Sequence, residues 1–91
     1  MKRAYIISYD LNSPGKNYES VLTALKSVGS WARLGGSAYI VISTMTAAQI
    51  RDKIMNVMDN NDQLFVGVVK APAAWFGLGD EVSNWLKNNL D

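Results

Sequence analysis

Short apolar segments alternate with polar ones along the chain, and four of them predict β-strands. They span residues 4–11, 30–34, 38–43 and 64–69. Most are rich in β-branched and aromatic side chains, which favour extended backbone. The first, third and fourth have apolar residues on both faces, which is typical of strands covered on two sides. Gly35-Gly36 separates the second segment from the third and predicts the turn of a hairpin.

Three other segments repeat apolar residues at the spacing of an α-helix. The first follows Asn17, a favourable N-cap, and we expect it to end at Gly29 in a left-handed conformation. Thr46 and Gln49 match the Ser/Thr-x-x-Glu/Gln capping box and predict the start of the second. Asp80 is expected to open a short third helix, because acidic residues are favoured in a first turn.

The order strand, helix, strand, strand, helix, strand predicts an α+β fold of the ferredoxin-like type. We expect a single domain over residues 1–91, with a core at 4–70 and a C-terminal extension at 71–91. Both core helices would cover one face of a four-stranded antiparallel sheet. The other face is also apolar, and exposed apolar surface of that extent usually marks an interface.

The C-terminal extension carries an aromatic tail and the short third helix, and it offers one cover for that second face. Either it packs on its own domain, or it crosses to a partner subunit. In the second case a homodimer interface would include Trp75, Phe76, Leu78 and Trp85, since contacts between sheet edges are an ordinary route to dimers. The sequence leaves both arrangements open.

Charge and missing residue types exclude several functions. Nine Lys and Arg against eight Asp and Glu give a net charge of +1, and the cations are scattered along the chain. Composition therefore gives no support for strong nucleic-acid binding, which usually requires a basic patch. The chain has neither Cys nor His, which excludes disulfides, thiolate metal sites and the Ser-His-Asp and Cys-His mechanisms. No apolar run approaches about 18 residues, so we expect a cytoplasmic protein without a membrane span.

Asp10 lies near the end of an otherwise apolar predicted strand, shortly before a polar loop at residues 12–15. In one interpretation it accepts backbone N–H groups and starts the turn. In the other its carboxylate is a metal ligand. Both interpretations remain open at the level of the sequence.

Four pieces of the chain, in this order and spacing, resemble one protein superfamily. They are the opening strand "YIISYDL", Gly29 after the first helix, the hairpin strand "GGSAYIVIST" and the closing strand "DQLFVGVV". The superfamily is that of the small CRISPR-associated adaptation subunit that scaffolds the spacer integrase. It also contains VapD-type ribonuclease toxins and stand-alone SinR-like relatives. The last third of the chain, with "AAWFGL" and "VSNWLKNNL", is most similar to the SinR-like relatives.

The resemblance implies a homodimeric, metal-dependent endonuclease with a role in phage defence. It implies that Asp10 of each subunit lies near the dimer axis and that the pair holds one Mg²⁺ ion for cleavage of RNA or DNA. Such an ion is often held by one or two carboxylates and water. Tyr9, Ser8 and Asn12 would orient water or phosphate nearby, and Lys16 and Arg33 would face the nucleic-acid backbone.

The chain departs from the adaptation subunit in its cations, and this keeps other functions open. The first helix of that family tends to carry several arginines, whereas "NYESVLTALKS" has none, and "WARLGGS" in the hairpin has only Arg33. One alternative is a non-catalytic dimeric interaction module, such as a phage or mobile-element accessory protein that binds a host protein through the aromatic tail. Another is a scaffold that holds duplex nucleic acid without cutting it. Asp10 would then be a turn residue or a relic.

Overall fold

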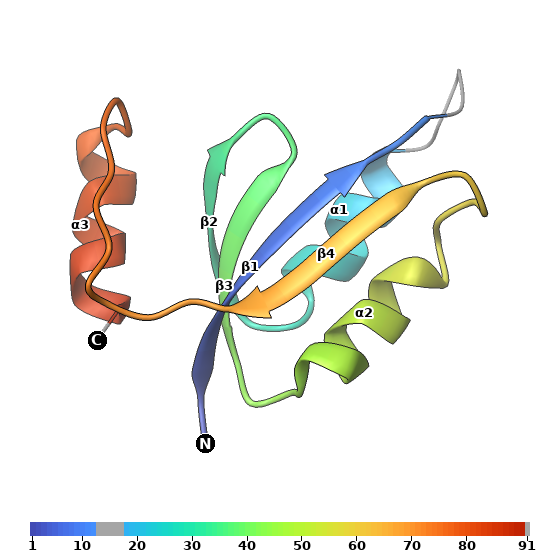
Figure 1. The fold of residues 1–91 in the computed structure, drawn as a ribbon, viewed down its shortest axis with the longest axis horizontal. Coiled ribbons are helices and arrows are strands. Elements are labelled where there is room, and N and C mark those ends of the chain that lie inside the picture. Colours follow the sequence, from blue (N-terminus) through green and yellow to red (C-terminus); the bar gives the residue numbers. More distant parts are fainter. Residues whose placement is uncertain (13–17, 91) are drawn as a thin grey trace.

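The computed structural model describes residues 1–12 and 18–90 (Figure 1). Its elements follow the predicted order, including the short helix after the fourth strand. In chain order they are β1 (Arg3–Asp10), α1 (Tyr18–Lys26), β2 (Ser30–Gly35), β3 (Ala38–Ser43), α2 (Ala47–Met55), β4 (Gln63–Val68) and α3 (Asp80–Asn89). None of the described helices has the length and apolar character needed to cross a bilayer.

These strands form one antiparallel sheet in the order β2-β3-β1-β4. The predicted α+β, ferredoxin-like fold is therefore confirmed. The first strand lies inside the sheet, and β2 and β4 lie at its edges. Figure 1 shows α1 and α2 on one side of the sheet and α3 on the other.

The main core lies between the sheet and the helices α1 and α2. Alternate side chains of β1 point into it, because successive residues of a strand face opposite sides. Its buried members are Tyr5, Ile7 and Tyr9 of β1, Tyr39 and Val41 of β3, Val21, Leu25 and Val28 from the first helix and its end, and Ile50 and Ile54 of α2. The helical spacing of the last five residues predicts this face.

The hairpin between β2 and β3 and the start of α2 form as their residue types predict. Gly35 and Gly36 have φ values of 136° and 52°, which residues with a Cβ rarely adopt. The Thr46 hydroxyl accepts a hydrogen bond from the Gln49 backbone N–H at 3.1 Å, and the Thr46 N–H donates to Gln49 Oε1 at 2.9 Å. The capping box is therefore confirmed. The helix ends at Met55.

Gly29 follows the first helix as expected, but the reason for a glycine there is different. Its φ is not positive, so the predicted left-handed cap is wrong. A Cβ built at Gly29 would lie 1.8 Å from the backbone oxygen of Ile42. The backbone leaving α1 therefore passes too close to β3 for any side chain. The predicted N-cap at Asn17 lies outside the described residues.

The C-terminal extension packs on its own chain, which is the first of the two arrangements left open. Helix α3 contacts β2, and Leu86 on that helix is only 2% exposed. Trp75 Nε1 donates to Ser83 Oγ at 3.0 Å, which ties the aromatic tail to the helix. Ala32 and Ile40, which lie on the second face of the sheet, are buried. The extension thus covers the β2–β3 half of that face.

Candidate functional site

The uncovered half of the second face holds the candidate site. Asp10 lies at the end of β1 and is exposed, as is Ser8 two residues before it. Tyr9 between them points into the core, so Ser8 and Asp10 share the face turned away from α1 and α2. In the neighbouring strand β4, Phe65 lies opposite Ser8, and Gln63 lies opposite Asp10.

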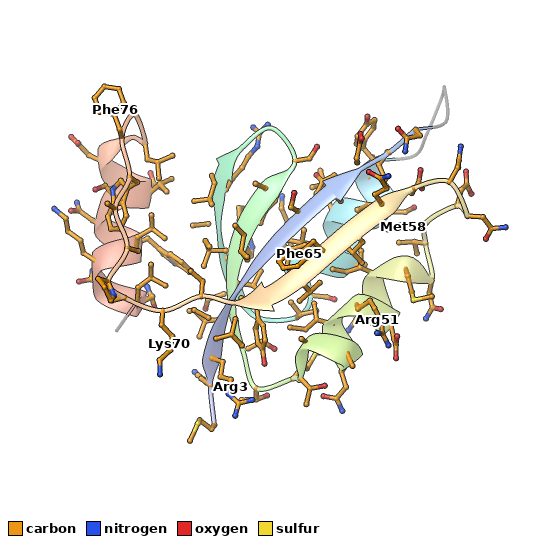
Figure 2. The ribbon with its side chains drawn as sticks, in the orientation of Figure 1. Arg3, Arg51, Met58, Phe65, Lys70 and Phe76 are labelled. Carbon is orange, nitrogen blue, oxygen red and sulfur yellow. The ribbon has the colours of Figure 1, made fainter. Side chains whose placement is uncertain are left out.

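These residues line a shallow hollow of about 210 Å³ at the junction of β1 and β4. Ser8, Asp10, Gln63 and Phe65 contribute to its lining. The Phe65 side chain is 62% exposed, and Figure 2 shows it on β4 near the middle of the sheet. An aromatic ring that exposed next to a carboxylate is unusual for a strand residue, because large apolar side chains are normally buried.

Among the described residues, Asp10 makes no contact that would assign it a structural role in the turn. Within residues 1–12 and 18–90 its carboxylate accepts no hydrogen bond and makes no ion pair. Asp62 performs that role instead: its Oδ1 accepts the Asn12 backbone N–H at 3.0 Å, and its Oδ2 accepts the Asp59 N–H at 2.8 Å. The Asp10 carboxylate therefore has no partner in the described part of the chain.

Of the four residues predicted to bind nucleic acid, Arg33 is placed elsewhere by the fold, and Tyr9 lines the hollow but turns its side chain into the core. Arg33 of β2 lies opposite Tyr39, whose side chain is in the main core, so Arg33 is on the other face of the sheet from Asp10. Its Nη2 donates to the Gly36 carbonyl at 3.2 Å within the hairpin. Tyr9 is a core residue and presents little surface. Neither side chain is brought together with the Asp10 carboxylate.

Neither of the other two predicted contacts is among the described residues that line the hollow. Asn12 is exposed, but its side-chain amide donates to the Asn61 carbonyl at 2.7 Å and holds the loop before β4. Lys16 lies outside the described residues. Of the predicted charged or polar set, Asp10 and Ser8 are presented on the open face in the part of the chain that the structure describes.

Tyr9 has an altered acidity because of its position in the core. Burial raises the pKa of its hydroxyl above the ordinary value of 10.0, and the neighbouring Tyr39 adds to the rise. A hydrogen bond with the Ser37 side chain and the charge of Arg33 oppose it. The net direction is upward, so folded Tyr9 keeps its proton to a higher pH than the unfolded chain does.

The raised pKa of Tyr9 predicts a loss of stability in base. Below about pH 10 both states hold the proton, and the shift has no effect. Above that pH the unfolded state loses its proton first, so the free energy of unfolding falls. We expect this fall to be less steep in Tyr9→Phe, measured by urea denaturation from pH 8 to 11. Equal slopes for the two proteins would contradict the assignment.

The four predicted interface residues differ in their exposure. Trp75, Leu78 and Trp85 are half-buried within their own chain. Phe76 is fully exposed, at 100%, and Figure 2 shows it at the far end of the tail from the sheet. Of these four side chains, Phe76 is therefore the one fully available to a partner.

Gln63 and Phe65 belong to the candidate site but were not predicted from the sequence. The alternation along "DQLFVGVV" places Gln63, Phe65 and Gly67 on one face and could have identified them. Which of the two faces is open, however, depends on how far the C-terminal extension reaches. That information is contained in the packing of α3 and not in the strand itself.

The residues around Asp10 have the donor atoms that a divalent cation requires, but one chain supplies too few carboxylates. Carboxylate, hydroxyl and amide oxygens from Asp10, Ser8 and Gln63 are the hard donors that Mg²⁺ prefers. In the described part of the chain, however, no three Asp or Glu side chains gather at one place. A single chain therefore offers one carboxylate to a metal ion at this hollow.

Comparison with known proteins supports the fold alone. No protein-family model matches the sequence, and no curated protein matches it. The fold is similar to that of a solved structure, the hypothetical protein TT1823 from Thermus thermophilus, with a TM-score of 0.67. The two sequences are 22% identical, and the match covers 87% of this chain and 95% of that one.

Proposed function

We propose that this chain forms a homodimer that cleaves phosphodiester bonds in RNA or DNA, with a divalent cation held between two copies of Asp10. Membership of the superfamily of the CRISPR-associated adaptation subunit, with its role in phage defence, is part of this proposal. The observation that carries it is the exposed Asp10 carboxylate, which has no partner among the described residues and borders an open sheet face.

A second copy of the chain is the partner that would complete the site. One Asp10 is too little for a stable cation site, whereas two related by a twofold axis give the pair of carboxylates with which Mg²⁺ is often held. Symmetric dimers use the same patch on both subunits. Phe65 lies beside Asp10 on that patch, so its exposed ring would be buried in the same contact.

The residues of the hollow would then have separate tasks. A bound divalent ion supplies polarisation of the phosphodiester and lowers the pKa of water. The two Asp10 carboxylates would hold the ion at the axis. Ser8 and Gln63 would donate hydrogen bonds to phosphate oxygens, and Phe65 would exclude bulk water from one side. No histidine is needed for this chemistry.

Cleavage assays with matched variants test the proposal. We expect wild type to cut labelled RNA or DNA with Mg²⁺ or Mn²⁺ and not with EDTA. Asp10→Asn should lower the rate at least about 100-fold, since each 1.4 kcal/mol of lost transition-state stabilisation is a factor of about ten. Asp52→Asn is the matched control, because its carboxylate is exposed on α2 and only pairs with Arg51 on the surface.

A charge introduced at Phe65 tests whether cleavage requires the dimer. Phe65→Glu should keep the fold, because the side chain is largely exposed, but it should convert the dimer to monomers and abolish cleavage. Light scattering gives the mass, and circular dichroism gives the fold. Cleavage that is unchanged in Asp10→Asn, or a monomeric wild type that is fully active, would refute the paired site.

A non-catalytic interaction module is the second candidate, and the exposed Phe76 favours it. A fully exposed aromatic side chain is a common anchor for a protein partner. The cleavage assay separates the two functions. Intact substrates under all metal conditions, with folded dimers, would favour the module and direct attention to the aromatic tail.

A further inference from the structure

A cavity of about 410 Å³ lies at the end of the sheet opposite to Asp10. It is lined by the first residues of β1, by the residues that follow β4, and by Asn89 at the end of α3. Arg3 and Asp10 are the two ends of the eight-residue strand β1. At about 3.3 Å per residue the cavity lies roughly 20–25 Å from the hollow at Asp10, so it is a separate site.

Three cations line this cavity, and the strand register brings two of them together. Tyr5 of β1 lies opposite Val68 of β4, and the Val69 N–H donates to the Ala4 carbonyl at 2.9 Å. The antiparallel pairing therefore brings Lys70 next to Arg3. Lys2 lines the same cavity, and Figure 2 shows Arg3 and Lys70 at the same end of the sheet.

No anion of the protein neutralises these three side chains in the part of the chain that the structure describes. Among residues 1–12 and 18–90, none of the three makes an ion pair, and the described lining of the cavity contains no Asp or Glu. Like charges on neighbouring strands destabilise a sheet. They are also three of only nine cations in a chain whose net charge is +1. Among the described residues, the charge at this cavity is thus more positive than the composition suggests.

Apart from Asn89, the rest of the described lining is apolar and indicates what the anion is attached to. Ile42 and the exposed side chain of Val68 lie beside the cations. A volume of about 410 Å³ falls within the range of small-molecule sites, about 300–1,000 Å³. Three cations match a phosphate monoester, which carries close to two negative charges at neutral pH, better than a singly charged phosphodiester.

We propose that this cavity binds a phosphate monoester of nucleotide size. Its phosphate lies between Lys2, Arg3 and Lys70, and its less polar body lies against Ile42 and Val68. The ligand is either a free nucleotide or the phosphorylated end of a polynucleotide, which present the same chemical group. This binding does not depend on cleavage at Asp10.

A titration of the ¹⁵N-labelled protein with adenosine 5′-monophosphate tests the site. It is carried out in EDTA, and binding is measured from the changes in amide chemical shifts. We expect saturable binding at millimolar ligand or below, with the largest shifts at Ala4, Ile42 and Lys70. Adenosine without the phosphate should bind at least tenfold more weakly, and inorganic phosphate should compete. A 5′-phosphorylated oligonucleotide that binds more tightly than the mononucleotide would identify a polynucleotide end as the ligand; the reverse order would identify a free nucleotide.

Paired substitutions give the decisive comparison. Arg3→Gln/Lys70→Gln should weaken binding of the mononucleotide at least tenfold, whereas Lys53→Gln on α2 should change it less than twofold. Shifts located elsewhere, adenosine binding as tightly as the phosphate ester, or equal weakening by both sets of variants would overturn the proposal. If the double variant does not fold, the wild-type shift map and the phosphate competition still support or overturn the site.

Discussion

Gly29→Ala is expected to destabilise the protein by at least about 3 kcal/mol, a large effect for the addition of one methyl group. The added Cβ would lie 1.8 Å from the Ile42 carbonyl oxygen and 2.9 Å from its carbon. Both atoms belong to the backbone of β3, so neither can move away as a flexible side chain could. The strand or the segment after α1 must shift, and this displaces the core residues on both.

Urea denaturation of Gly29→Ala and of a matched control measures this effect. Gly79→Ala is the control, because its Cβ would meet no atom within 4 Å and its φ is −60°. We expect the control to change the free energy of unfolding by less than about 1 kcal/mol. If the two variants unfolded at the same urea concentration, the close approach of Gly29 to β3 would be wrong.

Ile40→Asp is expected to leave the chain largely unfolded. Ile40 lies on β3, inside the sheet, and is only 3% exposed beneath the C-terminal extension. An unpaired carboxylate there costs several kcal/mol, roughly the whole stability of a small domain, which is about 5–15 kcal/mol. Ile40→Val removes one methyl group and should cost only about 1 kcal/mol.

The two Ile40 variants and Phe65→Glu test whether the C-terminal extension covers Ile40 on the second face. Circular dichroism and thermal melting give the fold and stability of each variant. Ile40 and Phe65 lie on the same face of the sheet, but only Ile40 is under the extension. A charge should therefore unfold the protein at Ile40 and be tolerated at Phe65. A cooperative melt of Ile40→Asp near the wild-type temperature would show that the extension does not cover this face.

Local signals in the sequence predict the order of the elements. Apolar periodicity separates strands from helices, and Thr46 with Gln49 marks the start of α2 through hydrogen bonds between neighbours in the chain. Gly35 and Gly36 mark the hairpin because their backbone conformation is costly for other residues. From these local signals the ferredoxin-like topology follows, since few arrangements bury such a set of faces.

Features that depend on contacts between distant segments could not be predicted in this way. Gly29 was assigned to a helix cap, whereas its real constraint is the carbonyl of Ile42, on the far strand of the hairpin. Arg33 was expected to face the nucleic-acid backbone, but the pairing of β2 with β3 places it on the opposite face of the sheet from Asp10. The exposure of Phe65 depends on how far the C-terminal extension reaches across the second face of the sheet. The meeting of Arg3 and Lys70 likewise depends on the register of β1 and β4.

Asp10 was identified from the sequence by its position at the end of an apolar strand, and the structure adds its surroundings. The absence of a partner in the described residues and the neighbouring Phe65 both follow from tertiary packing. The proposed cleavage depends on two copies of Asp10 sharing one divalent ion.

Binding of Mn²⁺, measured by calorimetry on protein whose mass is determined by light scattering, tests that sharing most directly. We predict a dimer that binds one Mn²⁺ per two chains, and a folded, dimeric Asp10→Asn variant that binds none at this site. A monomeric wild type, or Mn²⁺ binding that is the same in Asp10→Asn, would contradict it.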